Sequence, residues 1–329
     1  MMIDLKTTFI GLQLKNPIII GSSGLTNSVE KIIQLEEDGA GAVVLKSLFE
    51  EQILVEMHTS KNDDHYDYPE AHDYASHYRR ERSINEYLEL IQKSKASVTI
   101  PIIASVNCIN GYEWSSFAEK IEKAGADALE INISLLPSDI NVSSSENEQK
   151  YFDIIENVKK HINIPIILKM SRYSSGLAQL VQKLSWTKNV DAFVLFNRYY
   201  SPDIDLEKMK IVSSNVFSSP EENSGTLRWI ALLSDKIQLP LVASTGIHDS
   251  EAFIKQLLAG AQAVQIVSTI YKNGNKRISE ILDGIESWME KNDYSSINDF
   301  RGKLNFADNK DTKFFERVQF MKYYNNNKS

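Results

Sequence analysis

The sequence predicts an α/β protein of the (β/α)8 TIM-barrel class, because two short phrases alternate along the chain with helical segments between them. One phrase is a proline followed by an apolar run, and it occurs at Pro17, Pro101, Pro165 and Pro240. The other is a small-residue lead into an apolar run, and it occurs at residues 39–46, 124–132, 190–195 and 260–266. Together they mark eight strands, and runs rich in Ile and Val are typical of parallel strands covered on both faces.

The segments between these strands carry apolar residues at three- and four-residue spacing, which predicts amphipathic helices. The predicted helices cover residues 28–37, 114–123, 145–161, 176–184, 250–258 and 278–290. Asp249 stands where a capping side chain is favoured, and Gly39, Gly125 and Gly260 stand where helices end in left-handed backbone. Eight strands alternating with helices predict the barrel.

Three segments lie outside this alternation. Residues 7–10 and 12–14 predict an N-terminal hairpin that turns at Gly11 and closes the barrel floor. The spacing of the strands also predicts two inserted segments, a His- and Tyr-rich, lid-like one at about residues 50–82 and a second at about residues 199–223. Both follow the carboxyl ends of strands, so we expect them to cover an active site. We predict one barrel domain at residues 1–311 and a tail at 312–329 whose end is disordered.

The composition excludes several classes of protein. Hydrophobic residues make up 42% and charged residues 24%, as in an ordinary globular protein, and no apolar run approaches the length of about 20 residues that a membrane helix needs. The net charge of -8 offers no field for nucleic acid. The lone Cys108 excludes an intrachain disulfide, and the histidine spacing in residues 58–77 fits no metal motif. We expect a cytoplasmic protein with a small-molecule substrate, no metal, and no nucleic-acid or membrane partner.

Polar residues follow the predicted strands at their carboxyl ends, where a barrel carries its chemistry. They are Ser22, Ser23, Lys46, Ser47, Ser105, Asn107, Asn132, Ser134, Lys169, Ser171, Asn197, Ser244, Thr245, Gly246, Ser268 and Thr269. The small and hydroxyl-bearing residues after the seventh and eighth strands indicate a phosphate site, which sugar-phosphate enzymes and flavin enzymes share.

An ordered set of fragments points to a family. The fragments are Lys15-Asn16-Pro17, Leu45-Lys46-Ser47, Glu130-Ile131-Asn132-Ile133-Ser134, Leu168-Lys169, Thr245-Gly246-Ile247, Val264-Gln265-Ile266 and Phe300-Arg301-Gly302-Lys303-Leu304. In order and spacing they resemble the dihydroorotate dehydrogenase family over about residues 8–304. The resemblance implies an FMN-dependent oxidoreductase that acts on CH–CH groups, commonly as a homodimer.

The resemblance also assigns roles to single residues. Ser22, Ser23 and Asn107 line the flavin and substrate space, and Lys46 with Ser47 reaches the ring near the substrate. Asn132 and Lys169 contact the isoalloxazine, where a fixed ammonium favours the negatively charged reduced flavin. Asn197 matches an asparagine that binds a substrate amide. The ribityl phosphate is assigned to Gly225, Thr245, Gly246, Ser268 and Thr269.

The chain departs from the family pattern mainly on the substrate side. Leu135 stands where the family has its catalytic Cys or Ser, and leucine accepts no proton, so Ser134 is the nearest candidate for that role. The family's orotate-binding segment has no counterpart in residues 58–82. The family's Gly-Gly and Gly-Thr pairs after the last two strands read Thr245-Gly246 and Val267-Ser268.

Three interpretations follow. The first is an FMN oxidoreductase that converts dihydroorotate to orotate in pyrimidine biosynthesis, or a related small polar substrate. The second is a lyase in which Lys169 or Lys46 forms a Schiff base with a phosphorylated carbonyl compound. The third is a flavin-binding paralogue without catalysis.

Overall fold

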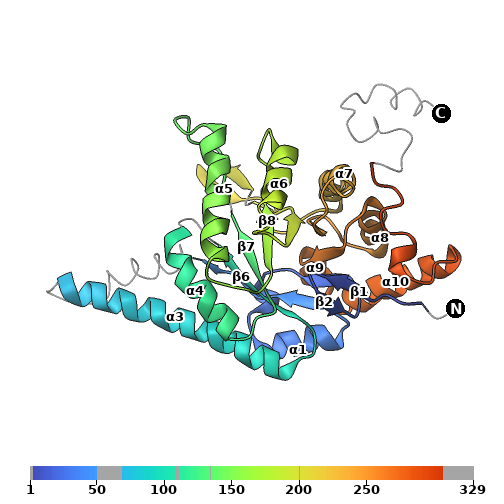
Figure 1. Ribbon diagram of the computed structural model, residues 1–329, viewed down its shortest axis with the longest axis horizontal. Coiled ribbons are helices and arrows are strands. Elements are labelled where there is room, and N and C mark those ends of the chain that lie inside the picture. Colours follow the sequence, from blue (N-terminus) through green and yellow to red (C-terminus); the bar gives the residue numbers. More distant parts are fainter. Residues whose placement is uncertain (1–2, 50–68, 108–110, 134, 200, 307–329) are drawn as a thin grey trace.

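Eight parallel strands close into a barrel in the computed structural model, which describes residues 3–49, 69–107, 111–133, 135–199 and 201–306 (Figure 1). The strands are β3 (Ile18–Ile20), β4 (Ala42–Val44), β6 (Ile102–Asn107), β7 (Ala128–Asn132), β8 (Ile166–Met170), β9 (Ala192–Leu195), β12 (Leu241–Ser244) and β13 (Ala263–Ile266). They neighbour one another in the order β4-β3-β13-β12-β9-β8-β7-β6, and the pairing of β4 with β6 closes the ring. Each strand lies at its predicted position, so the predicted fold class is confirmed.

Helices surround this barrel. They are α1 (Val29–Glu37), α3 (Pro69–Ser97), α4 (Gly111–Lys123), α5 (Ser144–Lys159), α6 (Leu177–Trp186), α7 (Asn223–Leu233), α8 (Ser250–Ala259), α9 (Ser268–Asn273) and α10 (Arg277–Lys291). The six predicted helices are present, and Asp249 caps α8 by accepting a hydrogen bond from the N–H of Ala252 at 2.8 Å. Among the described residues, no helix combines the length and the apolar character needed to cross a bilayer.

The helix α3 occupies part of the predicted insertion. Residues 69–82 form its first half, while residues 50–68 lie outside the described residues. Its second half packs on the barrel through the buried side chains of Tyr87 and Ile91. Excess length between two strands predicts an insertion without saying whether it is helical, so the sequence did not identify this helix.

The two repeated phrases are joined at the amino ends of the strands by aspartate side chains. Oδ2 of Asp127 accepts a hydrogen bond from the N–H of Ile102 at 2.7 Å, and Oδ2 of Asp191 accepts one from Ile166 at 2.7 Å. In each case the aspartate of a small-residue phrase holds the strand that begins just after a proline. The repetition in the sequence therefore reflects a repeated contact between neighbouring strands.

An N-terminal hairpin closes the barrel floor, as predicted. It consists of β1 (Thr7–Phe9) and β2 (Leu12–Leu14), which pair antiparallel around a turn with Gly11 at φ 84°. Phe9 and Leu14 are buried in the barrel interior. The residues that make room for them are small, and they are Ala42, Ala128, Ala192 and Ala263.

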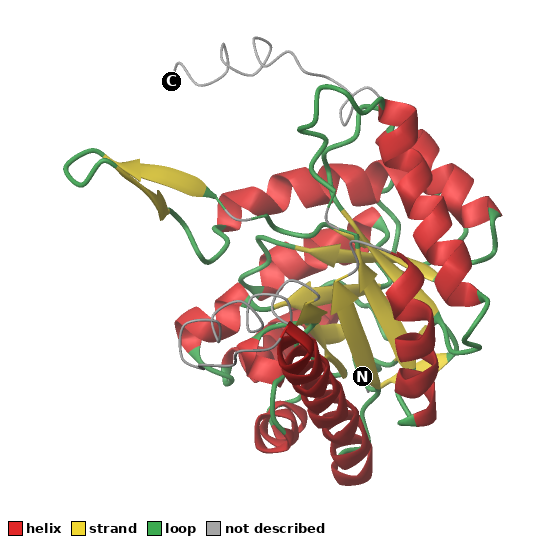
Figure 2. Cartoon of the chain, turned by 90° about the vertical axis from the view of Figure 1, so that its left-hand side faces the viewer, coloured by secondary structure: helices red, strands yellow, loops and turns green. Residues whose placement is uncertain are grey.

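A second hairpin lies within the predicted excursion at residues 199–223. It is formed by β10 (Pro202–Asp205) and β11 (Lys210–Ser213), and it projects away from the barrel (Figure 2). The chain then returns to the carboxyl end of the barrel through residues 214–219, which precede the short 3-10 turn Pro220–Glu222. The excursion therefore has two parts, an exposed hairpin and a return segment at the barrel mouth.

Candidate active site

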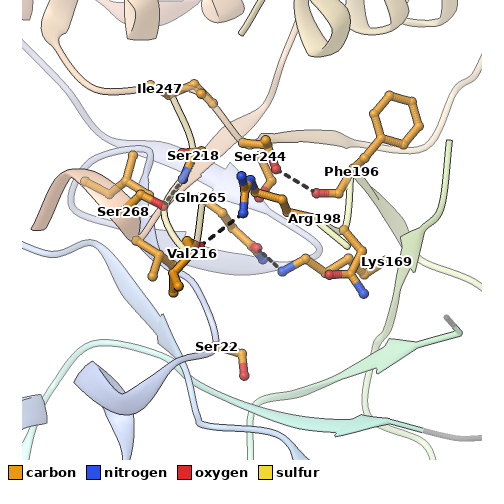
Figure 3. A pocket seen from close by; sticks show the side chains of 15 residues that line it. Ser22, Lys169, Phe196, Arg198, Val216, Ser218, Ser244, Ile247, Gln265 and Ser268 are labelled. Atoms are coloured by element: carbon orange, nitrogen blue, oxygen red, sulfur yellow. Dashed lines mark hydrogen bonds between the residues drawn. The ribbon is translucent and has the colours of Figure 1, made fainter. Parts of the chain in front are cut away.

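Two adjoining cavities open at the carboxyl ends of the barrel strands. The smaller one, of about 250 Å³, lies between the loops that follow β9, β12 and β13 (Figure 3). The larger one, of about 580 Å³, lies over the ends of the strands from β3 to β9. Ser22, Lys169, Asn197 and Arg198 line both cavities, so the two form one continuous site. The larger cavity is of the size that small-molecule and cofactor sites usually have.

Most of the residues predicted from the sequence line this site. The larger cavity is lined by Ser22, Ser47, Asn107, Asn132, Lys169 and Asn197. The smaller cavity is lined by Ser22, Lys169, Asn197, Thr245, Gly246 and Ser268. Residues from the ends of all eight barrel strands thus meet at one place, as the barrel topology requires.

Four predicted residues lie outside the lining of both cavities, and Ser134 lies outside the described residues. Ser23 caps a 3-10 turn, since its Oγ accepts a hydrogen bond from the N–H of Leu25. Thr269 is buried and its hydroxyl donates to the carbonyl of His248 at 2.9 Å. Gly225 lies within helix α7.

Lys46 is the fourth of these residues, and its side chain is exposed. Strand β4 ends at Val44, and the N–H of Lys46 donates to the carbonyl of Thr26 rather than to a neighbouring strand. The inward and outward alternation of the strand therefore does not extend to Lys46, although its sequence position is in phase with Val44.

A chain of hydroxyl groups crosses the floor of the larger cavity. Oγ of Ser22 and Oγ of Ser47 are 2.9 Å apart, and Oγ of Ser47 is 2.7 Å from Oγ of Ser105. Nδ2 of Asn132 donates to Ser105 at 3.0 Å and to Ser47 at 3.3 Å. Because these groups satisfy one another, the carboxamide oxygen of Asn132 and the open side of Ser22 have a fixed orientation at the cavity.

Three side chains form a network at the floor of the site that we call the polar bridge: Lys169 and Gln265, which line the cavities, and Glu130, which lies behind them. Nζ of Lys169 donates to Oε1 of Gln265 at 2.8 Å and lies 3.3 Å from Oε1 of Glu130. Nε2 of Gln265 donates to Oε2 of Glu130 at 2.5 Å. Glu130 is fully buried, so its charge is compensated by these partners alone among the described residues.

The negative charge of Glu130 also reaches Tyr87 of α3. Burial of the Tyr87 hydroxyl is the main cause that raises its pKa, and the carboxylate of Glu130 adds to this effect, while the hydrogen bond to Ser105 opposes it. The hydroxyl donates to the carbonyl of Ser105 at 3.0 Å and accepts from the N–H of Ser105 at 2.7 Å. Tyr87 therefore stays a neutral phenol that holds β6 in place beneath the hydroxyl chain.

The loops after β12 and β13 present main-chain N–H groups to the smaller cavity. Thr245 and Gly246 have φ of 84° and 79°, so both lie in the left-handed region. A Cβ atom at Gly246 would lie 2.2 Å from the main-chain N of Asn223, so only glycine fits there. Within the described part of the chain, the N–H groups of Gly246, Ile247 and Ser268, which all line this cavity, donate no hydrogen bond. Clustered, unpaired N–H groups of this kind suit an anion.

Arg198 holds the return segment over this cavity. Its Nη1 donates to the carbonyls of Asn215 at 2.9 Å and Val216 at 3.0 Å, and its Nε lies 2.9 Å from Oε2 of Glu222. Burial opposes ionisation of Glu222, but hydrogen bonds from Arg198 and from the N–H of Ser219 hold its pKa below the usual range. The guanidinium thus joins the end of β9 to the return segment and to the 3-10 turn that follows it.

Ser218 fixes the other side of the return segment. Its N–H donates to Oγ of Ser268 at 3.0 Å (Figure 3), and its carbonyl accepts from Nζ of Lys272 at 2.8 Å. Its hydroxyl lies 3.1 Å from Nε2 of His248. Burial, followed by the positive charge of Lys272, lowers the pKa of His248, so this imidazole is neutral at neutral pH. The wall of the smaller cavity is therefore made by contacts between segments far apart in the sequence.

The side chain that follows β7 toward the larger cavity is Leu136. It lines this cavity and is 56% exposed, whereas Leu135 faces a separate pocket beside α5. The carbonyl of Leu135 accepts a hydrogen bond from the hydroxyl of Tyr199 at 3.2 Å. Among the described residues, neither cavity is lined by a carboxylate, a histidine or a cysteine.

Several residues that line the cavities were not predicted from the sequence, and two of them, Gln265 and Arg198, make the contacts described above. Gln265 is the one polar residue in the run Ala263–Ile266, and polarity inside an otherwise apolar strand was the signal for it. Arg198 directly follows Asn197, but no sequence pattern indicated that its partners are Glu222 and the return segment.

The described residues contain no group of three or more His, Cys, Asp or Glu side chains that could hold a metal ion.

Comparisons with known proteins address the family. A family model described as dihydroorotate dehydrogenase matches residues 81–289, which is more than half of the chain. The chain belongs to the dihydroorotate dehydrogenase family. The catalytic subunit of dihydroorotate dehydrogenase B (NAD(+)) from Thermoplasma volcanium is 26% identical over 310 residues, which cover 92% of this chain and 98% of the relative.

Two further relatives carry the same name. The subunit from Pyrococcus furiosus is 26% identical over 308 residues, covering 91% of this chain and 98% of its own. The subunit from Caldicellulosiruptor bescii is 27% identical over 317 residues, covering 92% and 99%. The family resemblance predicted from the sequence is therefore confirmed, and it supports an oxidoreductase of the dihydroorotate dehydrogenase type.

Proposed function

We propose that this protein is an FMN-dependent oxidoreductase that acts on a C–C bond next to a carbonyl group in a small polar substrate. The observation that carries the proposal is the continuous site at the barrel mouth, with the Lys169 ammonium at its floor and unpaired N–H groups at one end. Dihydroorotate is the first substrate to test, because the chain belongs to the dihydroorotate dehydrogenase family. Its place in pyrimidine biosynthesis depends on that substrate.

The residues of the site fit FMN. The N–H groups of Gly246, Ile247 and Ser268 would hold the phosphate group, with positive φ at Thr245 and Gly246 keeping the loop close. Lys169 and Asn132, which are register partners on β8 and β7, would contact the ring. When bound, FMN would supply the two-electron transfer, which no protein side chain of the site can perform.

The side chains of the larger cavity would orient the substrate. Asn107, Asn132 and Asn197 offer carboxamide groups to an amide or a carbonyl, and the contribution of Asn132 is its oxygen, because its nitrogen donates to Ser105 and Ser47. The hydroxyl of Ser22 lies beside them at the entrance shared by both cavities. This set of groups favours a polar, hydrogen-bonding substrate over an apolar one.

Proton transfer is the step for which the described lining offers no ordinary base. Ser134 remains our candidate for this step, with Lys46 and Asn197 as the other predicted catalytic residues. A serine hydroxyl is a weak base, and a positioned base usually contributes about 10²- to 10⁴-fold to the rate. We therefore expect slow turnover of dihydroorotate.

The lyase interpretation is weakened by the surroundings of Lys169. A Schiff base requires a neutral amine that is free to attack a carbonyl. Nζ of Lys169 instead donates to Gln265 and lies 3.3 Å from the carboxylate of Glu130. The non-catalytic interpretation is compatible with the site, and only turnover can separate it from the oxidoreductase.

We further propose a homodimer located in the cytoplasm. The homodimer rests on the family resemblance, and the cytoplasmic location rests on the composition and the single cysteine. Both are open to simple measurements, namely the mass of the purified protein in solution and its distribution between cell fractions.

The test begins with the visible absorption spectrum of the purified protein and the mass of any pigment released on heating. We expect flavin bands and one FMN per chain, and anaerobic addition of dihydroorotate should bleach these bands slowly. The variant Lys169→Met should bind FMN more weakly, while Lys183→Met, on the outer helix α6, should behave as wild type.

The outcomes separate the three interpretations. A protein that binds FMN in neither redox state contradicts the proposal. Bound FMN that no dihydroorotate, related substrate or artificial acceptor can turn over supports the non-catalytic paralogue. Borohydride trapping of a phosphorylated aldehyde on Lys169 would support the lyase.

A further inference from the structure

We propose that Glu130 lowers the preference of this site for reduced over oxidised FMN, because its carboxylate compensates the charge of Lys169 from inside the barrel. Gln265 is a positioning residue, whose neutral amide holds Lys169 and Glu130 in this arrangement. This inference rests on the proposed binding of FMN and goes beyond it, since it assigns a redox role to Glu130, which lines neither cavity, and a positioning role to Gln265 in the wall of the smaller one.

The polar bridge spans the bore of the barrel. Glu130 lies on β7 and Gln265 on β13, and the ring order places four steps between these strands in either direction. They are therefore opposite one another, and the hydrogen bond between their side chains crosses the interior. Strands β4 and β9 are also opposite one another in the ring, and they carry Val44 and Val194, which are both fully buried. Opposite strands of this barrel can therefore carry buried apolar residues in place of a polar pair.

The orientation of the Gln265 amide is determined by its two neighbours. Its oxygen accepts from the ammonium of Lys169, and its nitrogen donates to the carboxylate of Glu130. The reversed amide would oppose a donor to a donor and an acceptor to an acceptor. Gln265 therefore links the carboxylate of Glu130 to the ammonium of Lys169, and it holds Nζ of Lys169 at the cavity floor.

The backbone leaves room for this amide. A Cβ atom at Gly21, at the end of β3, would lie 3.4 Å from Oε1 of Gln265 and 2.8 Å from Cγ2 of Val267. Any larger residue at position 21 would press on the bridge from the side. The polar bridge therefore depends on glycine at position 21, which has no side chain to contact Gln265.

Burial makes the charge of Glu130 effective. Among the described residues, Glu130 is the one buried carboxylate and Lys169 is the one buried ammonium. Charges act over several ångströms in a poorly solvated interior, so a flavin above Lys169 would sense the pair rather than an isolated ammonium. A stability role alone does not account for the pair, because buried ion pairs stabilise a fold little compared with apolar packing.

Three variants test the proposal, and each keeps the size of the interior nearly constant. Glu130→Gln removes the negative charge and keeps the shape. Glu130→Gln/Gln265→Glu exchanges the carboxylate and the amide across the barrel, which restores the charge. Gln265→Leu breaks the bridge while the ion pair of Lys169 and Glu130 remains.

The control is Glu122→Gln. Oε1 of Glu122 accepts hydrogen bonds from the N–H groups of Asn163 and Ile164, which precede β8 at the opposite end of the barrel. This control removes the same charge from the chain without touching the mouth.

The measurement is the ratio of the dissociation constants of oxidised and dithionite-reduced FMN, determined without substrate. We expect Glu130→Gln to shift the ratio about tenfold toward reduced FMN, a rise of about 30 mV for a two-electron couple. The exchanged double variant should return to within about threefold of wild type, and Gln265→Leu should shift the ratio by less than about threefold. Glu122→Gln should leave it unchanged.

The results distinguish this inference from the proposed function. If wild type binds no FMN in either redox state, both fail. If FMN binds but Glu130→Gln weakens both redox forms equally, Glu130 is structural and the inference alone is overturned. If Glu130→Gln does not fold, a tenfold shift in Gln265→Leu, or a double variant far from wild type, overturns it as well.

Discussion

The two ends of the barrel interior are built from opposite kinds of side chain. At the floor, Phe9 and Leu14 of the hairpin pack against small and branched apolar residues of the strands. At the mouth, the polar bridge lies beneath a chain of serine hydroxyls and a carboxamide. The interior side of the floor hairpin packs in an apolar cluster, whereas the mouth buries an ion pair.

This difference suggests that the floor of the barrel mainly determines stability and that the mouth mainly determines function. Apolar burial at the floor contributes directly to the free energy of folding, because it removes hydrocarbon from water. The buried pair at the mouth contributes little net stability for the same volume, so its retention calls for another reason. Changes at the floor should therefore alter stability alone, and changes at the mouth should alter flavin properties.

The largest effect is expected at the floor. Phe9→Ala should lower the free energy of unfolding by about 3–5 kcal/mol, since it leaves a cavity among residues that cannot collapse into it. FMN affinity of the folded fraction should stay unchanged. Denaturant unfolding and FMN titration check both statements, and Ile211→Ala, on the exposed hairpin, is the control with almost no loss. Weakened FMN binding in Phe9→Ala would break the separation of the two ends.

At the mouth, Lys169→Met should cost about 3 kcal/mol, because it strands the carboxylate of Glu130 in the interior. Adding Glu130→Gln to this variant should recover most of the stability but none of the FMN affinity. Thermal unfolding and flavin titration of the single and double variants measure the two properties. A double variant no more stable than Lys169→Met would show that the pair is not the source of the loss.

Gly246→Ala should cost about 2 kcal/mol and weaken FMN binding, because its Cβ would meet the main chain of Asn223 at 2.2 Å. Gly274→Ala is a matched control, since Gly274 has a similar φ of 78° with nothing within 4 Å of the added atom. The difference between the two variants isolates the close approach from the backbone strain. Equal losses of stability would mean that the loops can separate without cost.

The smallest effect concerns pH. The pKa of Glu222 is lowered in the folded protein, so its carboxylate stabilises the fold above the ordinary glutamate pKa and loses this effect as the pH falls through the lowered value. Glu222→Gln should thus lose less than about 1 kcal/mol at neutral pH and nothing in acid. Denaturant unfolding across this range tests it, with the exposed Glu207→Gln as control. A constant difference between wild type and Glu222→Gln would contradict the sign.

The order of the strands, the floor hairpin and the helix caps were predictable from local sequence. Each depends on residues that are near one another in the chain, such as a proline before an apolar run or an aspartate before α8. The positions of Ser22, Ser47, Asn132 and Lys169 at the mouth followed from the same local periods, because the carboxyl ends of parallel strands share one end of a barrel.

The absence of Lys46 from the lining of both cavities and the helical first half of α3 were not predictable in this way. Lys46 has the right phase, but β4 ends two residues before it. In the sequence, Thr245 stands where the family has a glycine, which suggested that the left-handed backbone conformation was lost there. The structure keeps a positive φ at Thr245, and the Thr245 hydroxyl donates to the carbonyl of Phe196 at 3.2 Å. The spacing of apolar residues alone does not predict where a strand ends, nor which strained backbone conformation a hydrogen bond stabilises.

By itself, the sequence determined the barrel, its floor and the set of polar strand ends, because period and turn chemistry act over a few residues. Only the tertiary structure decided that Glu130 meets Gln265, 135 positions away, and that Arg198 reaches the return segment. The reason is closure: which inward residues face one another across a barrel depends on the number and stagger of all its strands, and no local segment contains that information.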